Sequence, residues 1–383
     1  MKMVLYFVFF LFSVHILFSQ TIPLIDVSKN YQNAAIKLQD IADIEYVPLE
    51  TNRNVLLDGD CRFPYISNNY IVASNVRQGD IFLFGRNGKI KYKFNHRGNG
   101  PHDYLDTRTI VFDEKNSEVF IFVQKAPNPV FLVYSEDGTY MRTIQCPQFT
   151  NNANMIIAKN FDDNNLLIYD AAVYGNHYAK NPYMLLSKKD GTVTSLNISL
   201  PKRYQYFVHF PDGELFFYCT PFVGSDGQDL IIADISCDTI FQLKRDKSLT
   251  PLLIRTPSVH RTEPKIYITA VFKTEKFMLL RRVKMPPQGS KTGSENSALI
   301  YNFSNGTINQ IRDFRFFNNT DDIANGTHNI RPEATLPQNT LLFRIQAAFL
   351  YEYRDELTGG ELKKIASTID EEDNPVLLIA KFR

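Results

Sequence analysis

The sequence contains no tryptophan and only four cysteines in 383 residues. Cys61, Cys146, Cys219 and Cys237 stand far apart, and none belongs to a C-x-x-C pair of the kind that binds metal or works in redox reactions. Four scattered cysteines are also too few for the disulfide framework of a small secreted protein. A hydrophobic core must therefore hold the fold, and 30 Phe and 20 Tyr supply its large side chains.

A surplus of charge is missing as well, because 42 basic and 41 acidic residues give a formal net charge of +1 at pH 7. Nucleic-acid-binding domains usually carry a marked basic excess, so we expect no nucleic-acid partner. The chain has no G-x-S-x-G, H-E-x-x-H or Walker motif. No catalytic residue, metal ligand or cofactor can therefore be assigned from a motif.

Long apolar runs are absent after Pro23, so we expect no transmembrane segment in the mature chain. The run before it has Lys2 as a positive start, an apolar stretch from Met3 to Phe18, and the small residue Ser19. This order is typical of a secretory signal peptide, here residues 1–19. The alternative is an uncleaved membrane anchor, which the shortness of the run disfavours. We expect an extracytoplasmic protein, in the periplasm, at the cell surface or secreted.

The remaining sequence repeats one pattern five times: an apolar strand, a polar turn and a second strand. The copies begin at Asp80, Pro129, Tyr183, Asp238 and Ala298. Four of the turns contain a glycine, which accepts the positive φ that hairpin turns require. Another strand pair precedes each copy, so the unit is four strands with a period of about 50 to 60 residues. This period predicts a β-propeller, whereas the alternative, a β-sandwich, has no such period.

Two blades need closer definition. In the fourth we expect the inner strands at "YFVHF" from Tyr206 and "ELFFYC" from Glu214, followed by a long loop over residues 220–229. The sixth would take strands from both ends of the chain, "TLLFRIQ" and "NPVLLIAKF" near the C-terminus and Asp43–Glu50 as the outer strand. Closing the ring in this way removes free sheet edges.

The predicted fold class is therefore all-β, a six-bladed β-propeller with four-stranded blades over residues 43–383. Residues 20–42 form an N-terminal lead-in, and the spacing of apolar residues predicts a small helical insert in the last blade. Cys219 and Cys237 flank one loop of the fourth blade, so we expect them close enough to form a disulfide in an oxidising compartment. Cys61 and Cys146 should be buried free thiols.

Three stretches resemble a known family: "IEYVPLET" from Ile44, "RGNGPHDY" from Arg97 and "EEDNPVLLIAKF" from Glu371. They are similar to the secreted six-bladed β-propeller proteins of Bacteroidetes-type bacteria, which are distantly NHL-like. The loop of that family usually reads G-x-G-P-x-E-Y, and Asp103 stands here in place of the Glu. The resemblance implies the propeller fold and an extracytoplasmic location, but no reaction.

The two faces of such a ring should differ in loop length. The turns after the first and third strands of each blade are short here, whereas the loops after the second and fourth strands are long. Long loops cost closure entropy and often carry function, so we expect the ligand on this long-loop face. The candidate ligand-binding residues on it are Arg97, His102, Tyr104, His177, Tyr178, Arg203, His260 and Arg281.

The stretch His96–Asp106 is the densest polar segment of the chain. We expect it to connect the first and second blades, with Tyr104 packed between them and Arg97 and His102 open to a ligand. His96 and His102 could instead hold a metal, but two histidines without a placed carboxylate are more simply structural.

Basic residues are frequent in the long loops, which suits an anionic ligand such as an acidic glycan, although loops are usually polar in any case. Tyr174, Tyr178 and Tyr204 could form an aromatic platform there. Three functions stay open: a module that binds a glycan or peptide, a hydrolase or lyase with a polar or metal-bearing channel, and a scaffold for protein partners. We expect a monomer.

Overall fold

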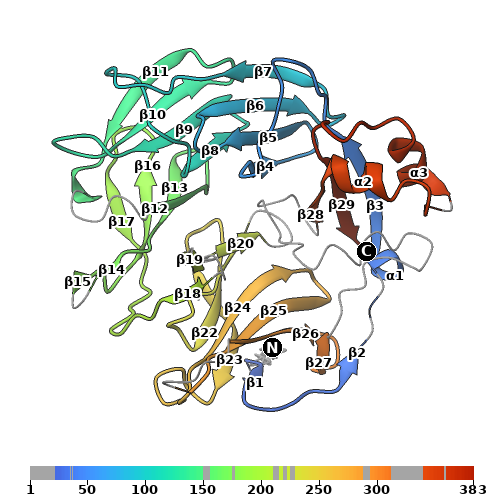
Figure 1. Cartoon of the computed structure of the whole chain (residues 1–383). Helices are drawn as coiled ribbons and strands as arrows, with labels where there is room; N and C mark the ends of the chain where they lie inside the picture. Colours follow the sequence, from blue (N-terminus) through green and yellow to red (C-terminus); the bar gives the residue numbers. More distant parts are fainter. Residues whose placement is uncertain are drawn as a thin grey trace, which may run out of the picture.

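Six of the eight β-sheets formed by the described residues surround a central axis like the blades of a propeller (Figure 1). The structure is a computed structural model that describes residues 22–34, 36, 38–149, 156–174, 177–209, 215–218, 222–224, 229–287, 294–311, 340–357 and 359–383. The predicted all-β, six-bladed propeller with four-stranded blades is confirmed.

The first three blades each contain four antiparallel strands in sequence order from the inside to the outside. Blade 1 contains β4 (Arg62–Ile66), β5 (Tyr70–Asn75), β6 (Asp80–Gly85) and β7 (Ile90–Phe94). Blade 2 contains β8 (Ile110–Asp113), β9 (Glu118–Val123), β10 (Val130–Ser135) and β11 (Tyr140–Gln145). Blade 3 contains β12 (Ile156–Asn160), β13 (Asn165–Asp170), β16 (Tyr183–Ser187) and β17 (Val193–Ser195). A short hairpin, β14 (Val173–Tyr174) with β15 (His177–Tyr178), extends the loop between β13 and β16.

Blade 4 differs from the prediction. Its sheet contains β20 (Phe222–Gly224), β21 (Leu230–Ile232), β22 (Thr239–Leu243) and β23 (Leu249–Thr256). The segments predicted as its inner strands, β18 (Tyr206–His209) and β19 (Leu215–Tyr218), form a two-stranded sheet of their own. The sequence was misleading because the P-D-G turn signal between the two segments marks a hairpin but not the sheet that it joins.

The ring closes as predicted, by a strand from the N-terminal end. Blade 5 contains β24 (Ile266–Lys273), β25 (Phe277–Lys284), β26 (Glu295–Asn302) and β27 (Ile308–Ile311). Blade 6 contains β28 (Thr340–Ile345), β29 (Val376–Phe382) and, outermost, β3 (Ala42–Pro48). β3 pairs with β29 in an unbroken antiparallel register from Ala42–Phe382 to Pro48–Val376.

The lead-in segment before β3 carries two strands that the sequence did not predict. β1 (Leu24–Asp26) adds in parallel to the outer strand of blade 4, β23, and β2 (Asn33–Ala34) adds in parallel to β27 of blade 5. The short helix α1 (Leu38–Ile41) then leads into β3. Residues 22–34, the N-terminal clasp, thus run along the outside of two blades before the chain completes a third (Figure 1, blue).

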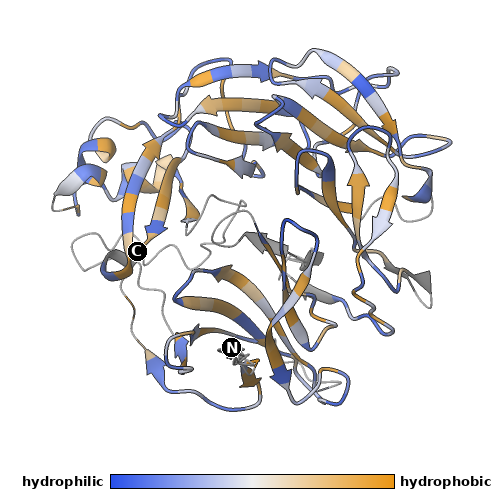
Figure 2. Cartoon of the chain, turned by 180° about the vertical axis from the view of Figure 1, so that it is seen from behind, coloured by the Kyte–Doolittle hydropathy of each residue, from blue (hydrophilic) through white to orange (hydrophobic). Residues whose placement is uncertain are grey.

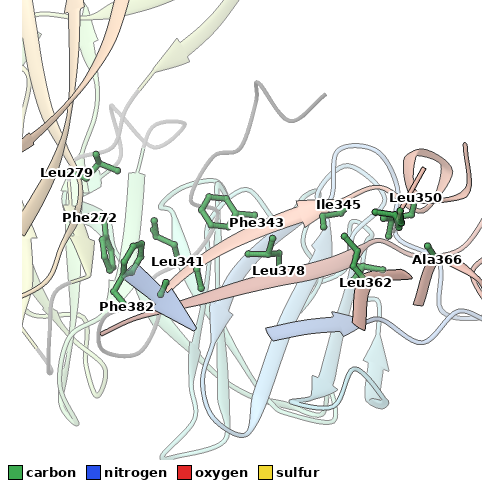
Figure 3. Close-up of a cluster of buried hydrophobic side chains, with 14 of the residues drawn as sticks. Phe272, Leu279, Leu341, Phe343, Ile345, Leu350, Leu362, Ala366, Leu378 and Phe382 are labelled. Atoms are coloured by element: carbon green, nitrogen blue, oxygen red, sulfur yellow. The ribbon is translucent and has the colours of Figure 1, made fainter. Parts of the chain in front are cut away.

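The hydrophobic core lies between neighbouring blades. Inner strands are covered on both faces, so β6 is buried at five of its six positions, whereas β7 on the outside is mostly exposed. Apolar residues are accordingly concentrated in the blade strands (Figure 2). In blade 6 the predicted helical insert, α2 (Ala347–Glu352) and α3 (Gly360–Ala366), packs Leu350 and Leu362 against the sheet (Figure 3).

The turn glycines behind the repeat have a structural reason. Gly88 has φ +78°, and a Cβ built there would lie 2.2 Å from the carbonyl oxygen of Pro48 in blade 6. Gly138 has φ +90°, and its Cβ would lie 2.4 Å from Cβ of Phe94 in blade 1. The turn between the third and fourth strands therefore packs tightly against the outer strand of the preceding blade, where only glycine fits.

Candidate functional site

The polar loop His96–Asp106 joins β7 to β8 and is built around the buried ring of Tyr104, whose side chain is 0% exposed. The Tyr104 hydroxyl donates to the carbonyl oxygen of Gly79 at 2.8 Å and accepts from the backbone N–H of His96 at 3.0 Å. Gly79 belongs to the loop between β5 and β6, so the segment lies on the long-loop face. Burial raises the pKa of the Tyr104 phenol well above its usual value, as expected for a ring at the structural centre of the loop.

Both histidines of the loop stack on tyrosines of blade 2. The His96 ring lies 5.1 Å from that of Tyr134, and its Nε2 is 2.8 Å from the carbonyl oxygen of Gly138. The His102 ring lies 3.7 Å from that of Tyr140, and the Tyr134 hydroxyl donates to the His102 carbonyl. The described residues contain no group of three His, Cys, Asp or Glu side chains suited to a metal. The loop therefore acts as a joint between blades 1 and 2.

Arg97 and His102 are the exposed residues of this joint that the sequence predicted as ligand contacts. Nε of Arg97 donates to the carbonyl oxygen of Leu105 at 3.1 Å, and the His102 ring is stacked as described above. Each side chain thus contacts protein on one side and faces solvent on the other.

Arg203, predicted as a ligand contact, is buried in the structure, with an exposed fraction of 6%. One terminal nitrogen donates to the Tyr169 hydroxyl and to the carbonyl oxygen of Asp170, both at 2.8 Å. The other donates to the carbonyl oxygen of Ala172 at 3.1 Å. The prediction was wrong about its direction, because a guanidinium that satisfies several backbone carbonyls is more stable inside the loop cluster than on its rim.

A buried chain of hydrogen bonds continues from Arg203 into blade 4. The Tyr169 hydroxyl donates to one carboxylate oxygen of Asp234 at 2.6 Å, and the Ser236 N–H donates to the other at 2.7 Å. The Ser236 hydroxyl then accepts from the backbone N–H of Tyr204 at 2.8 Å. This network joins blade 3 to blade 4 and fixes the backbone of the loop at Tyr204.

Tyr204 is the centre of the basic cluster that we call the Tyr204 patch, formed by Lys202, Tyr204, His260 and Lys265. The Tyr204 hydroxyl is 3.2 Å from Nδ1 of His260. The Nζ atoms of Lys202 and Lys265 each lie 5.3 Å from the centroid of the Tyr204 ring. Contacts of this kind between ammonium groups and an aromatic ring are attractive, so the ring holds positive charge around it.

The second loop of the patch, residues 257–265, is also anchored. The N–H of Val259 donates to a carboxylate oxygen of Asp238 at 2.7 Å. Buried Arg255 donates from Nε to the carbonyl oxygen of Pro257 at 3.0 Å and also donates to that of Ile266. Burial lowers the pKa of Arg255 to about 10, so its charge is kept at neutral pH. Both loops therefore present the patch from fixed backbones.

The other predicted residues lie elsewhere. The backbone of His177 and Tyr178 forms β15, but their side chains lie outside the described part of the structure. Arg281 is partly buried on β25, opposite Thr269 of β24. Of the eight candidate ligand-binding residues, only His260 belongs to the Tyr204 patch. Arg203 precedes Tyr204 in the chain and is buried. Lys265 was missed because its loop looked no different in sequence from other polar connections.

The cysteines also differ from the prediction. Cys237 is a free, partly buried thiol, whereas a disulfide was expected, and its expected partner, Cys219, lies outside the described residues. Cys61 and Cys146 are buried cysteines outside any disulfide, as predicted, and Sγ of Cys61 accepts a hydrogen bond from Arg344 at 3.0 Å. Burial raises the pKa of Cys237 to about 11 and that of Cys146 to about 12, so both are protonated and unreactive at neutral pH.

Asp234 offers a test of how the patch is held. Asp234→Asn removes the charge and one acceptor from the buried network, so we expect the free energy of unfolding to fall by about 1–3 kcal/mol. We also expect weaker ligand binding by the protein that remains folded, although Asp234 is 5% exposed and does not reach the surface of the patch. Urea unfolding and calorimetry measure the two effects, with Asp246→Asn in an exposed turn of the same blade as control. Unchanged affinity in folded Asp234→Asn would show that the network does not position the patch.

Comparison with known proteins places the chain in a family. Residues 22–381 match the model of a domain of unknown function, DUF4934. The chain belongs to this family. No curated protein sequence matches it.

Solved structures support the same fold for this DUF4934 protein. It is similar to an exported protein of Bacteroides fragilis, with a TM-score of 0.64 and 12% identity over 95% of this chain and all of the other. A DUF4221 member from Bacteroides vulgatus matches 90% of this chain and 97% of its own with a TM-score of 0.46 and 11% identity. The similarity to the Bacteroides fragilis protein supports the fold. Within the described residues, no helix has the length and apolar character needed to cross a membrane.

Proposed function

We propose that this DUF4934 protein is an extracytoplasmic binding module that holds an anionic ligand, a glycan or a peptide, at the Tyr204 patch. One observation supports the proposal most: two separately anchored loops bring three basic side chains around one aromatic ring. Charged side chains of an ordinary solvated loop do not require a backbone that is anchored in this way. Fixing side chains before binding lowers the entropy cost of association.

The charge balance of the patch favours an anion. Lys265 is 18% exposed, donates to the carbonyl oxygen of Thr262 at 2.8 Å and pairs with Glu263 at 3.2 Å, but the Glu263 side chain is 76% exposed. An ion pair so open to water contributes little, so an acid group of a ligand can replace it. Lys202 and neighbouring Arg261 are exposed and add further positive charge. The patch therefore attracts acid groups, more strongly at low ionic strength.

The location rests on three supports. The N-terminal run has the order of a signal peptide, three stretches of the sequence resemble secreted Bacteroidetes-type propellers, and the similar Bacteroides fragilis protein is an exported one. Binding on the long-loop face also agrees with the general use of long loops for function.

The double variant Lys202→Gln, Lys265→Gln tests the proposal. We expect it to weaken binding of an anionic ligand by about 10-fold or more, because two charge-assisted contacts are lost. Ligands come from arrays of acidic glycans and acidic peptides, and calorimetry measures the affinities.

The matched control is the double variant Lys89→Gln, Lys91→Gln in blade 1, with Lys89 in the turn after β6 and Lys91 on β7. It removes the same charge, and Lys91 also lies over a tyrosine ring, at 4.0 Å from the centroid of Tyr70. We expect its affinity to equal that of the unaltered protein. An equal loss in both double variants would mean that only net charge matters and that the patch is no specific site.

A further inference from the structure

We infer that the acid group recognised at the Tyr204 patch is carried by a saccharide. The inference rests on the proposed function and narrows its ligand class. It depends on three features of the patch: an aromatic ring, positive charge beside it, and a lack of exposed apolar side chains.

The first feature is the ring itself. Tyr204 is half-buried, and buried Tyr267 supports it at a distance of 6.1 Å between ring centroids. The C–H groups on one face of a sugar ring carry a slight positive charge, and aromatic rings attract such charge to their faces. A ring held from behind and fixed at its backbone is a suitable surface for one sugar unit.

The second feature is the position of the charges. Lys202 and Lys265 lie at equal distances from the ring, and His260 lies at its hydroxyl. Both Nζ atoms lie over the ring, so a sugar that rests on the ring must displace a lysine side chain toward its edge, where the ammonium group can pair with the carboxylate or sulfate of the sugar. The hydroxyl and imidazole supply hydrogen-bond partners for the neutral hydroxyl groups of the same sugar.

The third feature separates a saccharide from a peptide. Both loops of the patch, residues 196–205 and 257–265, are described throughout. Neither contains an exposed large apolar side chain: Leu196, Ile198, Leu200 and Val259 are buried, and Ile235 and Met285, which pack against the same cluster as Tyr204, are partly buried. Peptide and protein partners usually gain most of their affinity from apolar or aromatic anchors that fill pockets. A ligand that is polar on all sides fits this surface better.

Calorimetry with four probes tests the inference: trigalacturonate, its neutral carboxyl-reduced counterpart, a sulfated trisaccharide and triglutamate as an acidic peptide. The proteins are the unaltered chain, Tyr204→Leu, which keeps apolar packing on Tyr267, and Tyr204→Phe, which removes only the hydroxyl. The two acidic saccharides distinguish a carboxylate from a sulfate as the preferred group.

We expect at least one acidic saccharide to bind about 10-fold more tightly than both the neutral saccharide and the peptide. Tyr204→Leu should lose about 10-fold in that affinity and Tyr204→Phe less. If the peptide binds as tightly and Tyr204→Leu has no effect, the saccharide inference is overturned while an anion-binding patch stands. If none of the acidic probes binds, the inference and the proposed function both fail.

Discussion

Removal of residues 22–34 is expected to lower the solubility and the melting temperature of the protein sharply. Ile25 and Val27 of the clasp are 0% and 1% exposed and belong to the core between blades 4 and 5. Each such side chain contributes about 1.5–3 kcal/mol through burial. Without β1 and β2, the outer edges of β23 and β27 would also be free to pair with other chains.

Arg282 of blade 5 forms further hydrogen bonds to the clasp. It is 6% exposed and donates to the carbonyl oxygens of Lys29, at 2.6 Å, and Val27, at 3.4 Å. Loss of the clasp would leave this buried charge short of acceptors, which typically costs several kcal/mol.

Two neighbouring point variants make the test sharper than a deletion. Ile25→Asp places a charge in the core, and we expect it to cost about 3 kcal/mol or more. Leu24→Asp is the matched control, because Leu24 is 62% exposed and its replacement should change stability by less than about 0.5 kcal/mol. Scanning calorimetry measures both. Equal melting temperatures would contradict the parallel pairing of β1 with β23.

Tyr104→Ala is expected to cost about 3–5 kcal/mol, as other replacements of buried aromatic side chains by alanine do. The ring fills the space between blades 1 and 2, and its hydroxyl bonds to the backbone of Gly79 and His96. Tyr104→Phe keeps the ring and leaves two buried backbone groups unpaired, so we expect an intermediate loss of about 1–3 kcal/mol.

Urea unfolding measures these differences, with Arg97→Ala from the same loop as the control. Arg97 is exposed, so its replacement should change stability by no more than about 0.5 kcal/mol. A stable Tyr104→Ala protein that has lost ligand binding would instead place the loop in the binding site and contradict its role as a joint.

Most of the fold could be predicted because it is repetitive. The sequence repeats a unit of four strands, with a glycine in most turns between the third and fourth strands, and an incomplete unit stands at each end of the chain. Together these features determine six blades and the closure of the ring through β3. The clasp strands β1 and β2 are three and two residues long, too short to leave a periodic pattern. Blade 4 was misassigned because several short apolar runs compete for the same positions in its sheet.

The site could be predicted only in outline. Loop length and basic residues indicated the long-loop face, which carries the Tyr204 patch that we propose as the site, and His260 lies in that patch. The direction of a single side chain depends on tertiary contacts that no pattern records. Arg203 turns inward to carbonyl groups of blade 3, whereas its neighbours Lys202 and Tyr204 form the surface. The Tyr104 side chain is likewise buried in the core.

Hydrogen–deuterium exchange with and without the tightest-binding anionic ligand tests the central claim most directly, because it locates the ligand on the ring without any mutation. We predict that the ligand slows exchange in residues 201–205 and 257–265, the two loops that carry the Tyr204 patch. The loop 96–106 and the short turns of the opposite face should exchange as before. Protection confined to either of those regions, with none in the two patch loops, would contradict the account.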